Sequence, residues 1–348
     1  MKIAIVGTLD KPIKHDSSGG TEIWTYNFVE GLIKKGHEVT LFSLKGSEST
    51  GKTVEVCSQS DITTNGVFSR EKFALYNIEE AMEVLKRQND FDLIHVSVFP
   101  FYYFLPFVKL FSKPVIFTIH GFNQFDYDGA KSMFEENKEG YYVFPSAFFL
   151  KQWPKPQNFR VIHHGINIDN FSYSNKPDDY YFWIGRICKS KGIEDAIKFA
   201  QEADEKLIIA GPIDDQDYFD QAVKPHLEEN IKYVGPVNFK EKVEYYKHSK
   251  ALIFTSKVNE AFGLTIIESL ACGSPVIAFD RGPSSEIIID SYNGFLIETD
   301  RGVDGFLDAS KKINQLERNN CRKSIEEKFN FENMLNQYLS VYESILSK

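Results

Sequence analysis

The stretch NEAFGLTIIESLACGSPVIAF (259–279) carries a loop, a helix and a strand in close succession. The apolar runs ALIFTS (251–256) and PVIAF (275–279) have the unbroken, partly β-branched composition of buried parallel strands. Between them LTIIESLAC has apolar residues at helical spacing, and Gly273 and Pro275 mark where that helix ends. The segment therefore predicts strand, loop, helix and strand, the repeating unit of a parallel α/β sheet.

Two glutamates, Glu260 and Glu268, lie on either side of the helix start near Gly263. The unpaired N–H groups of a helix's first turn attract anions, phosphate above all, and this loop would lie at the carboxyl edge of the sheet, where ligands bind. Carboxylates accept hydrogen bonds from hydroxyl groups. A ligand with central phosphates and hydroxyls at both ends, such as a nucleotide sugar, suits this layout. From the spacing alone, the simpler interpretation is preferred, in which Glu260 is a loop charge and Glu268 a solvated helix residue.

Two cations follow another predicted strand in FWIGRICKSKG (182–192). Arg186 comes directly after the strand and Lys191 follows within the same loop. Arginine binds phosphate oxygens as a planar fork and lysine binds them as a point charge. Two surface cations are a common alternative, but their place at the carboxyl end of a strand makes a diphosphate site a stronger candidate.

Strands and helices alternate along most of the chain, which indicates doubly wound α/β architecture. The stretch 165–180 interrupts this rhythm with Asn, Asp, Ser and Pro, as a linker does. We therefore expect two Rossmann-like parallel-sheet domains facing across a cleft. The predicted strands are 2–7, 37–44, 92–98, 114–120, 140–145 and 159–164 in the first domain, and 181–185, 206–211, 231–235, 251–256 and 275–279 in the second.

Composition limits the classes of function. The chain has 348 residues, enough for two domains, and a formal net charge of −9, which disfavours nucleic acid and anionic lipid as general partners. The four cysteines are scattered without zinc-ligand spacing. Because neither a signal peptide nor a run of ~20 apolar residues is present, we expect a cytoplasmic protein without an integral membrane segment.

Five segments, taken in order, resemble retaining GT-B glycosyltransferases of family 4. EAFGLTIIE is similar to their E-x7-E motif, and ESLACGSPVIAFDRGPSSEII resembles the stretch that follows it. GRICKSKGIEDAIKFA is similar to their GR…KG segment, VIHHGINIDNF to their entry into the second domain, and Gly19-Gly20 to their N-terminal glycine loop. The resemblance implies transfer of a hexosyl group, with retention, from a nucleotide diphosphate sugar to an acceptor hydroxyl.

The resemblance also implies roles for individual residues, without cofactor or metal. Arg186 and Lys191 would hold the donor diphosphate, and the backbone of Phe262, Gly263 and Leu264 the distal phosphate. Glu260 would bind the donor sugar, Glu268 the ribose, and Gly19 and Gly20 would also contact the donor. His120, at the end of PVIFTIHG, matches the histidine that faces the donor sugar, so that the catalytic set is His120, Glu260, Arg186 and Lys191.

Domain boundaries follow from the same resemblance. We expect an acceptor domain over 1–170, a donor domain over 171–331, and a final helix over 332–348 that crosses back to the first domain. The sequence departs from many relatives at Gly282-Pro283, where Pro283 removes a backbone donor, and at His164, where relatives often have Asn. The acceptor is not identified, although aromatics over 122–127 could form a sugar-stacking wall.

Other functions stay open at this point. An epimerase or a phosphorylase can use the same fold, the latter with pyridoxal phosphate, and a sugar-binding protein without activity would retain the same motifs. GSESTGKT (46–53) fits the P-loop pattern of an NTP-driven switch, but a P-loop must lead into a helix and the following TVEVCSQSDITT predicts a strand. Three D-x-D matches in one acidic chain are too unspecific to predict a metal site.

Overall fold

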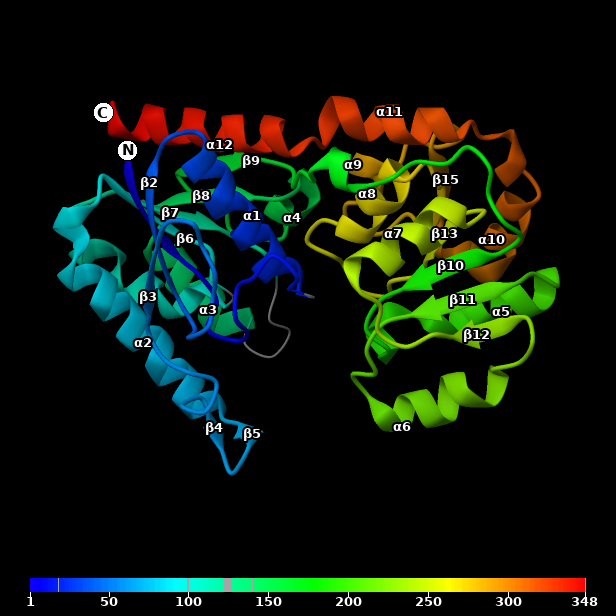
Figure 1. The fold of residues 1–348 in the computed structure, drawn as a ribbon, viewed down its shortest axis with the longest axis horizontal. Helices are drawn as coiled ribbons and strands as arrows, with labels where there is room; N and C mark the ends of the chain where they lie inside the picture. The colour runs from blue at the N-terminus through cyan, green and yellow to red at the C-terminus, as the bar shows by residue number, and fades with distance from the viewer. Residues whose placement is uncertain (18, 99, 122–126, 139, 348) are drawn as a thin grey trace. The chain divides into compact units, whose positions relative to one another are not determined.

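The computed structural model describes residues 1–17, 19–98, 100–121, 127–138 and 140–347. They form two compact units, here called unit 1 (Met1–His163 with Leu335–Lys348) and unit 2 (His164–Met334) (Figure 1). No helix in this described part of the chain combines the length and the apolar character needed to cross a bilayer.

Unit 1 is built on a seven-stranded, wholly parallel sheet. In spatial order its strands are β3 (Lys52–Glu55), β2 (Glu38–Ser43), β1 (Lys2–Val6), β6 (Leu93–Val96), β7 (Val115–Thr118), β8 (Tyr141–Phe144) and β9 (Asn158–Val161). Its other elements are α1 (Gly20–Lys34), a hairpin of β4 (Thr63–Thr64) and β5 (Val67–Phe68), α2 (Arg70–Lys86), the 3-10 segments η2 (Phe101–Tyr103) and η3 (Leu105–Leu110), α3 (Tyr127–Glu136) and α4 (Ala147–Lys151).

Unit 2 repeats this architecture on a six-stranded parallel sheet. In spatial order its strands are β12 (Ile231–Tyr233), β11 (Leu207–Ala210), β10 (Tyr181–Ile184), β13 (Leu252–Phe254), β14 (Val276–Phe279) and β15 (Gly294–Ile297). Its helices are α5 (Ile193–Ala203), α6 (Gln216–Tyr218), α7 (Phe239–His248), α8 (Leu264–Ala271), α9 (Ser284–Ile287), α10 (Gly302–Ser310) and α11 (Arg318–Lys328).

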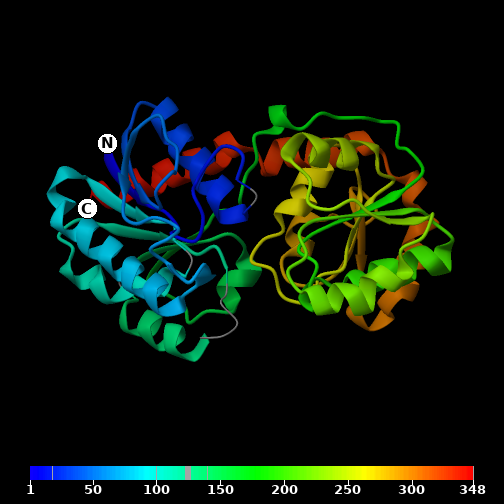
Figure 2. The same ribbon diagram turned by 60° about the horizontal axis from the view of Figure 1, so that its bottom comes forward.

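Helices lie on both faces of the unit 2 sheet (Figure 2), and alternation along its strands divides the core between these two faces. Tyr181 and Trp183 of β10 belong to one apolar cluster with residues of α5 and α10. Phe182, between them, belongs to a second cluster with residues of α7, α8 and α11. The apolar runs that predicted these strands are unbroken because helices cover both faces.

Helix α12 (Phe331–Leu346) begins in unit 2 and ends in unit 1. Its Tyr338 and Tyr342 are fully buried in unit 1. The Tyr338 hydroxyl lies 2.9 Å from Oγ1 of Thr118, and the Tyr342 hydroxyl hydrogen-bonds with Nδ1 of His95. The imidazole of His95 also meets Thr118 at 2.8 Å, so the helix is held to the sheet by buried hydrogen bonds as well as apolar contact.

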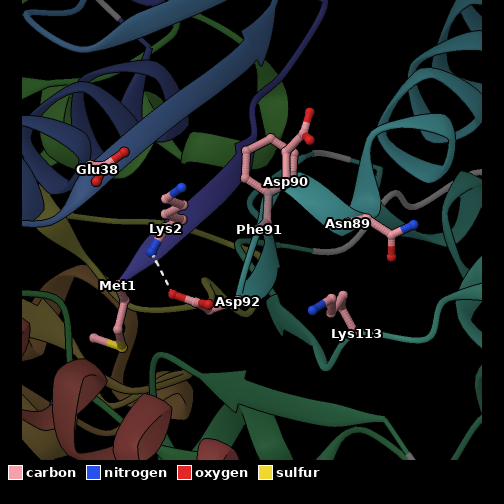
Figure 3. A pocket seen from close by; sticks show the side chains of 8 residues that line it. All are labelled: Met1, Lys2, Glu38, Asn89, Asp90, Phe91, Asp92 and Lys113. Carbon is pink, nitrogen blue, oxygen red and sulfur yellow. Dashed lines mark hydrogen bonds between the residues drawn. The ribbon is translucent and has the colours of Figure 1, made fainter.

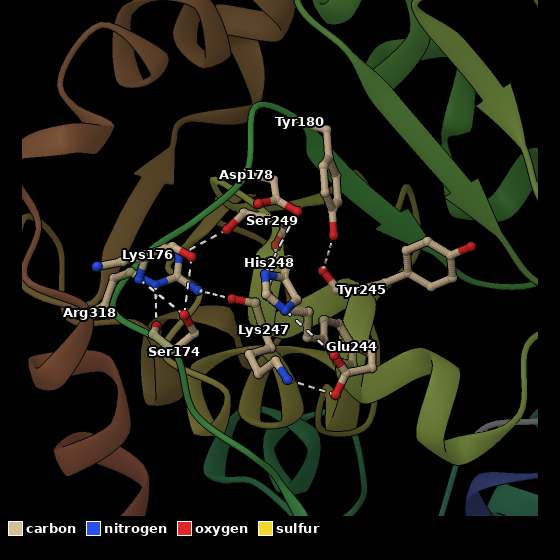
Figure 4. Close-up of polar contacts among 11 residues, drawn as sticks. Ser174, Lys176, Asp178, Tyr180, Glu244, Tyr245, Lys247, His248, Ser249 and Arg318 are labelled. Atoms are coloured by element: carbon tan, nitrogen blue, oxygen red, sulfur yellow. Dashed lines mark hydrogen bonds and ion pairs between the residues drawn. The ribbon is translucent and has the colours of Figure 1, made fainter.

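The predicted linker is fastened to unit 2 over its second half (Figure 4). The guanidinium of Arg318, which is 8% exposed, donates to the carbonyls of Ser174, Ser249 and Lys247 at 2.7, 2.8 and 2.7 Å. The Tyr180 hydroxyl donates to the Tyr245 carbonyl at 3.0 Å. Ile166 and Ile168 pack in the same core cluster as α8, so unit 2 begins at His164, before the expected boundary at residue 170.

The predicted fold class, two doubly wound Rossmann-like domains, is confirmed. The segment 46–53 leads into β3, an edge strand of unit 1, and not into a helix. It therefore lacks the helix N-terminus on which a P-loop depends. Strand β15 is not among the predicted strands.

Candidate functional site

The chain order in the sheet of unit 2 reverses at β10, which lies between β11 and β13. Loops that leave the carboxyl ends of such neighbouring strands diverge, and ligands of open α/β sheets bind at this point. The loop after β10 carries Arg186 and Lys191, and the loop after β13 carries Glu260. Sheet topology thus brings together the two segments that the sequence analysis selected.

Lys191 and Glu260 form an ion pair, with 2.5 Å between Nζ and Oε1. Their side chains are 23% and 24% exposed, so the pair is shielded but open to a ligand. The Ser256 hydroxyl donates to the same Oε1 at 2.7 Å. Among the residues that the structure describes, none donates to Oε2 of Glu260, so this oxygen can accept a ligand hydroxyl.

The loop after β10 is held tightly against the loop after β13. Trp183 Nε1 donates to Oγ1 of Thr255 at 3.0 Å, and that hydroxyl donates to the Lys191 carbonyl at 3.1 Å. Gly192 has φ of +66°, and a Cβ there would lie 2.2 Å from the Thr255 carbonyl oxygen. A glycine is required on both counts, and the close approach fixes the main chain from which the Lys191 side chain extends.

A second glycine supports the loop that carries Glu260. Gly282 has φ of +62°, and a Cβ there would lie 3.2 Å from the Glu260 backbone nitrogen. The neighbouring Arg281 donates from Nη1 to the Lys257 carbonyl at 3.1 Å. The segment after β14 therefore holds the Glu260 loop in place, although Pro283 replaces the second glycine of many relatives.

Glu268 lies one turn into α8, which starts after Gly263 at φ of +117°. Its carboxylate is bound from α7, by Nζ of Lys242 at 2.8 Å and by the Tyr246 hydroxyl at 3.1 Å. Burial, with the neighbouring Glu268 charge, raises the pKa of Tyr246 well above its ordinary value, so this phenol stays a donor. Glu268 is thus a fixed, 12% exposed acceptor and not a solvated helix residue.

Two predicted residues are placed differently from the Lys191–Glu260 pair. Arg186 is exposed and pairs with Asp214, with 2.6 Å between Nη1 and Oδ2. The Phe262 side chain is buried, and its ring packs against His164 and Phe329 at centroid distances of 5.2 and 5.8 Å. The Phe262 side chain therefore belongs to the core of unit 2 and does not face a ligand.

His120 lies in unit 1, just after β7. Its Nε2 is 2.9 Å from Oγ of Ser97, which is 3.0 Å from Oγ1 of Thr25, and the Trp24 ring lies edge-on with 4.8 Å between centroids. Burial, aided by the nearby His95, lowers the pKa of His120 to about 3. The imidazole is therefore neutral at physiological pH, able to exchange hydrogen bonds but not to supply a charge.

Gly19 and Gly20 open α1, Gly19 as its N-cap residue. A Cβ at Gly19 would lie 1.8 Å from Oε2 of Glu22, so the glycine makes room for this buried carboxylate. Burial raises the pKa of Glu22 above its ordinary value. An acidic group already occupies the space beside this helix start, and sequence analysis did not single it out.

Aromatic residues after β6 fill the core of unit 1, as expected for most of them. Phe101, Tyr102 and Phe104 are buried. The residues 122–126 proposed for the acceptor wall lie outside the described part of the chain. Within that part, no cluster of three or more His, Cys, Asp or Glu side chains could hold a metal ion.

A polar pocket of about 520 Å³ lies at the amino ends of the unit 1 strands, on the side away from their carboxyl ends (Figure 3). Lys2, Asp92 and Lys113 line it at the starts of β1, β6 and β7, and the Lys2 backbone N–H donates to Asp92 at 2.7 Å. Because ligand sites of parallel sheets lie at the carboxyl ends of strands, this pocket is separate from the candidate site.

Comparison with known proteins follows the same division of the chain. Residues 167–330 match the family model described as "Glycosyl transferases group 1", and residues 18–170 match the one described as "Glycosyltransferase Family 4". Together the two matches cover residues 18–330, and both models describe glycosyltransferases.

One curated relative matches along nearly the whole chain. The chain is 26% identical to this relative, an uncharacterized glycosyltransferase of Methanocaldococcus jannaschii, with 99% of this chain and 98% of the relative covered. Against some other curated relatives the chain spans about half of their length, 56% for another M. jannaschii glycosyltransferase.

Solved structures share the fold. A sucrose-phosphate synthase from Thermosynechococcus elongatus has a TM-score of 0.82 at 20% identity, with 99% of both chains covered. Anabaena Alr3699/HepE, crystallised in complex with UDP and glucose, has a TM-score of 0.75 at 17% identity, with 99% of this chain and 100% of that chain covered.

Sequence analysis missed the partners that hold the predicted residues. Ser256 and Lys242 bind the two glutamates, and Ser97 binds His120. Ser256 ends the apolar run ALIFTS, which was a usable signal because polar residues that end parallel strands lie at the ligand edge. Lys242 is one of several lysines on an ordinary surface helix, and nothing in the local sequence sets it apart.

Proposed function

We propose that the protein transfers a sugar from a nucleotide diphosphate donor to an acceptor hydroxyl, with retention of anomeric configuration, as a hexosyltransferase of family 4. The observation that carries the proposal is the Lys191–Glu260 pair beside the start of α8 at the β10–β13 switch point. A cation, an anion-attracting helix N-terminus and a carboxylate acceptor suit a ligand that combines phosphate with sugar hydroxyls.

In this proposal the diphosphate lies against Lys191 and the backbone N–H groups at the start of α8. Lysine has three N–H donors, so Lys191 can bind a phosphate oxygen while it still pairs with Glu260. Glu260 holds the sugar through Oε2, and Glu268 accepts from the ribose hydroxyls. Arg186 would have to leave Asp214, or share it, to reach the phosphates.

The reaction assigned to this site is a front-face substitution. The acceptor oxygen bonds to the anomeric carbon on the side from which the diphosphate leaves, the bond from that carbon to the phosphate oxygen breaks, and the acceptor proton passes to the departing diphosphate. Lys191 and the α8 N-terminus stabilise the charge that develops on the leaving group. For His120 the proposal assigns a hydrogen bond from a neutral imidazole to a sugar hydroxyl.

Two further points belong to the proposal. The structural neighbour crystallised with UDP and glucose supports a nucleotide diphosphate sugar as donor. We also propose that the enzyme works in the cytoplasm, without a metal or other cofactor. The acceptor in this proposal is a compound with a free hydroxyl group, without further identification.

Calorimetric titration with UDP, ADP and GDP tests the donor site directly. One of them should bind, and Lys191→Ala should weaken it roughly 10- to 100-fold, because a hydrogen bond to a charged group contributes about 1.5–3 kcal/mol. Lys189→Ala, an exposed lysine of the same short segment, is the matched control and should bind normally. Retention is then read from the anomeric coupling of the product by NMR.

Two results would contradict the proposal. If no nucleotide diphosphate binds, or if both lysine variants bind like the wild type, the donor does not lie at this site. If the product has the inverted configuration, the mechanism is not front-face substitution.

A further inference from the structure

Helix α2 exposes an apolar stripe on its outer side. Leu75, Ile78 and Met82 are 64%, 37% and 46% exposed, and their spacing of three and four residues places them in one line along the helix. The opposite side of α2 carries the buried residues Phe73, Asn77, Glu80, Ala81 and Val84. In Figure 1 the helix lies at the edge of unit 1. A contiguous exposed apolar face of this kind marks an interaction surface.

Charged residues of opposite sign end this stripe. Glu71 lies one turn before Leu75, in the first turn of α2, and Lys86 lies one turn after Met82, in its last turn. Both are exposed. Read along the helix, the line is therefore acid, three apolar residues, base. Read in the opposite direction, the same line runs base, three apolar residues and acid.

We propose that α2 packs antiparallel against α2 of a second copy of the chain about a two-fold axis. With the axis midway between residues 78 and 79, Glu71 meets Lys86 of the second copy and Leu75 meets its Met82. Each contact occurs twice, as an isologous interface requires. The opposed helix dipoles add to the attraction.

Exposed apolar residues also lie near both ends of α2. Val67, 68% exposed on the β4–β5 hairpin, precedes the amino end of α2. Leu110, 60% exposed on η3, lies near the carboxyl end, because the backbone N–H and the hydroxyl of Ser112 donate to Gln88 Oε1 at 2.6 and 2.9 Å. Antiparallel pairing brings the amino end of one copy toward the carboxyl end of the other.

An anionic lipid surface suits this face less well than a second copy does. Glu71 and Glu79 are both exposed on or beside the stripe, and the whole chain carries a net charge of −9. Lipid binding calls for a predominantly basic border. The alternation of sign from one end to the other instead suits a partner with the same pattern reversed.

Sedimentation velocity over a range of protein concentrations tests the proposal with charge reversals. The wild type should dimerise. Glu71→Lys and Lys86→Glu should each weaken the dimer roughly 10- to 100-fold, because each reversal replaces two opposite-charge contacts with like-charge contacts. An equimolar mixture of the two variants should dimerise again, since every contact in the mixed dimer regains opposite charges.

Controls separate this interface from loss of fold. Arg87→Glu reverses a charge in the same turn but off the stripe, where Arg87 pairs with Glu83 at 2.6 Å, and should dimerise like the wild type. Leu75→Ser should be monomeric, with an unchanged circular-dichroism spectrum. The proposal is overturned if the wild type stays monomeric, if the single reversals dimerise normally, or if their mixture does not recover. A monomer that sediments with anionic lipid vesicles would assign the face to membrane binding and overturn it equally.

Discussion

The ammonium of Lys191 and the carboxylate of Glu260 lie 2.5 Å apart although 69 residues separate them in the chain. One follows β10 and the other follows β13, and these strands are neighbours only because the sheet reverses its order there. The pair already balances its own charge, so in the proposed donor complex α8 and Arg186 would have to help stabilise the added negative charge of the diphosphate.

The two glutamates should fail differently when they are altered. Glu268→Gln should weaken both free nucleotide diphosphate and intact donor, because both ligands carry the ribose. Glu260→Gln should bind the free nucleotide diphosphate at least as tightly as the wild type, because Lys191 loses its counter-charge. Its transfer rate should still fall by about 10²-fold, since sugar placement is lost.

Titration calorimetry beside a transfer assay decides this prediction, and a circular-dichroism melt confirms folding of both variants. If Glu260→Gln loses the free nucleotide as badly as Glu268→Gln does, the two carboxylates do not divide the ligand as proposed.

Glu80 should make the protein less stable as the pH rises. Its side chain is fully buried in α2, and no described residue hydrogen-bonds either oxygen. Burial raises its pKa well above the ordinary 4.5, so the folded protein keeps a proton that the unfolded chain releases. Stability is therefore complete below pH 4.5 and is lost as the pH rises toward the folded pKa.

Glu80→Gln removes this charge and should raise the melting temperature at neutral pH. The neighbouring exposed Glu79→Gln should change stability by only about 0.5 kcal/mol. Melts of both variants from pH 4.5 to pH 8 give the comparison, and equal pH dependence in Glu80→Gln and wild type would contradict the prediction.

His95 should make the protein labile to acid. It is fully buried, and burial lowers its pKa from 6.5 to about 3. The unfolded chain thus binds a proton below pH 6.5 that the folded state refuses, so stability falls as the pH drops from 6.5 toward 3. At pH 5 the loss is on the order of 2 kcal/mol.

His95→Gln should be less stable at neutral pH, because His95 hydrogen-bonds Thr118 and Tyr342. Its unfolding free energy should nevertheless vary less between pH 7 and pH 5 than that of the wild type. Urea titrations at the two pH values measure the unfolding free energy of both proteins. If this free energy changes as much between pH 7 and pH 5 in His95→Gln as in the wild type, another group causes the acid sensitivity.

Lys52→Ala should leave sugar transfer unchanged. Lys52 is the lysine of the P-loop-like segment, but it begins the edge strand β3 and is exposed. A surface substitution of this kind changes stability by about 0.5 kcal/mol at most. Loss of activity in a folded Lys52→Ala protein would show that residues 46–53 bind nucleotide after all.

Local signals made most of the fold predictable. The apolar runs of β10 and β14 are short, β-branched or aromatic, and bounded by glycine or polar residues. Helix α8 ends at Ala271, two residues before the predicted stop signal Gly273. β15 escaped prediction because its four residues begin with glycine and follow a turn. Whether a segment forms a strand depends largely on residues close to it in the chain, so strands can be predicted from a single sequence.

Partners distant in the chain were less predictable. The resemblance selected Glu268, but the ion pair between Glu268 and Lys242 depends on how α7 packs on α8. The Arg186–Asp214 pair likewise depends on β11 lying beside β10. The linker was predicted from composition, yet Arg318 fastens it from 144 residues away. Such contacts follow from the assembled fold and not from any local pattern.

The core of unit 1 is complete only when helix α12 has been synthesised, which happens after unit 2. Residues 1–163 leave the ribosome before unit 2 does, but the core that they form also contains Tyr338 and Tyr342, which are made after unit 2. At about 5–20 residues per second, synthesis of the intervening unit takes on the order of ten seconds or more. During that interval the growing chain presents an unfilled apolar surface on its first sheet, while unit 2 can close around its own core. Termination of synthesis between unit 2 and Tyr338 would therefore damage unit 1, although most of unit 1 is translated before unit 2.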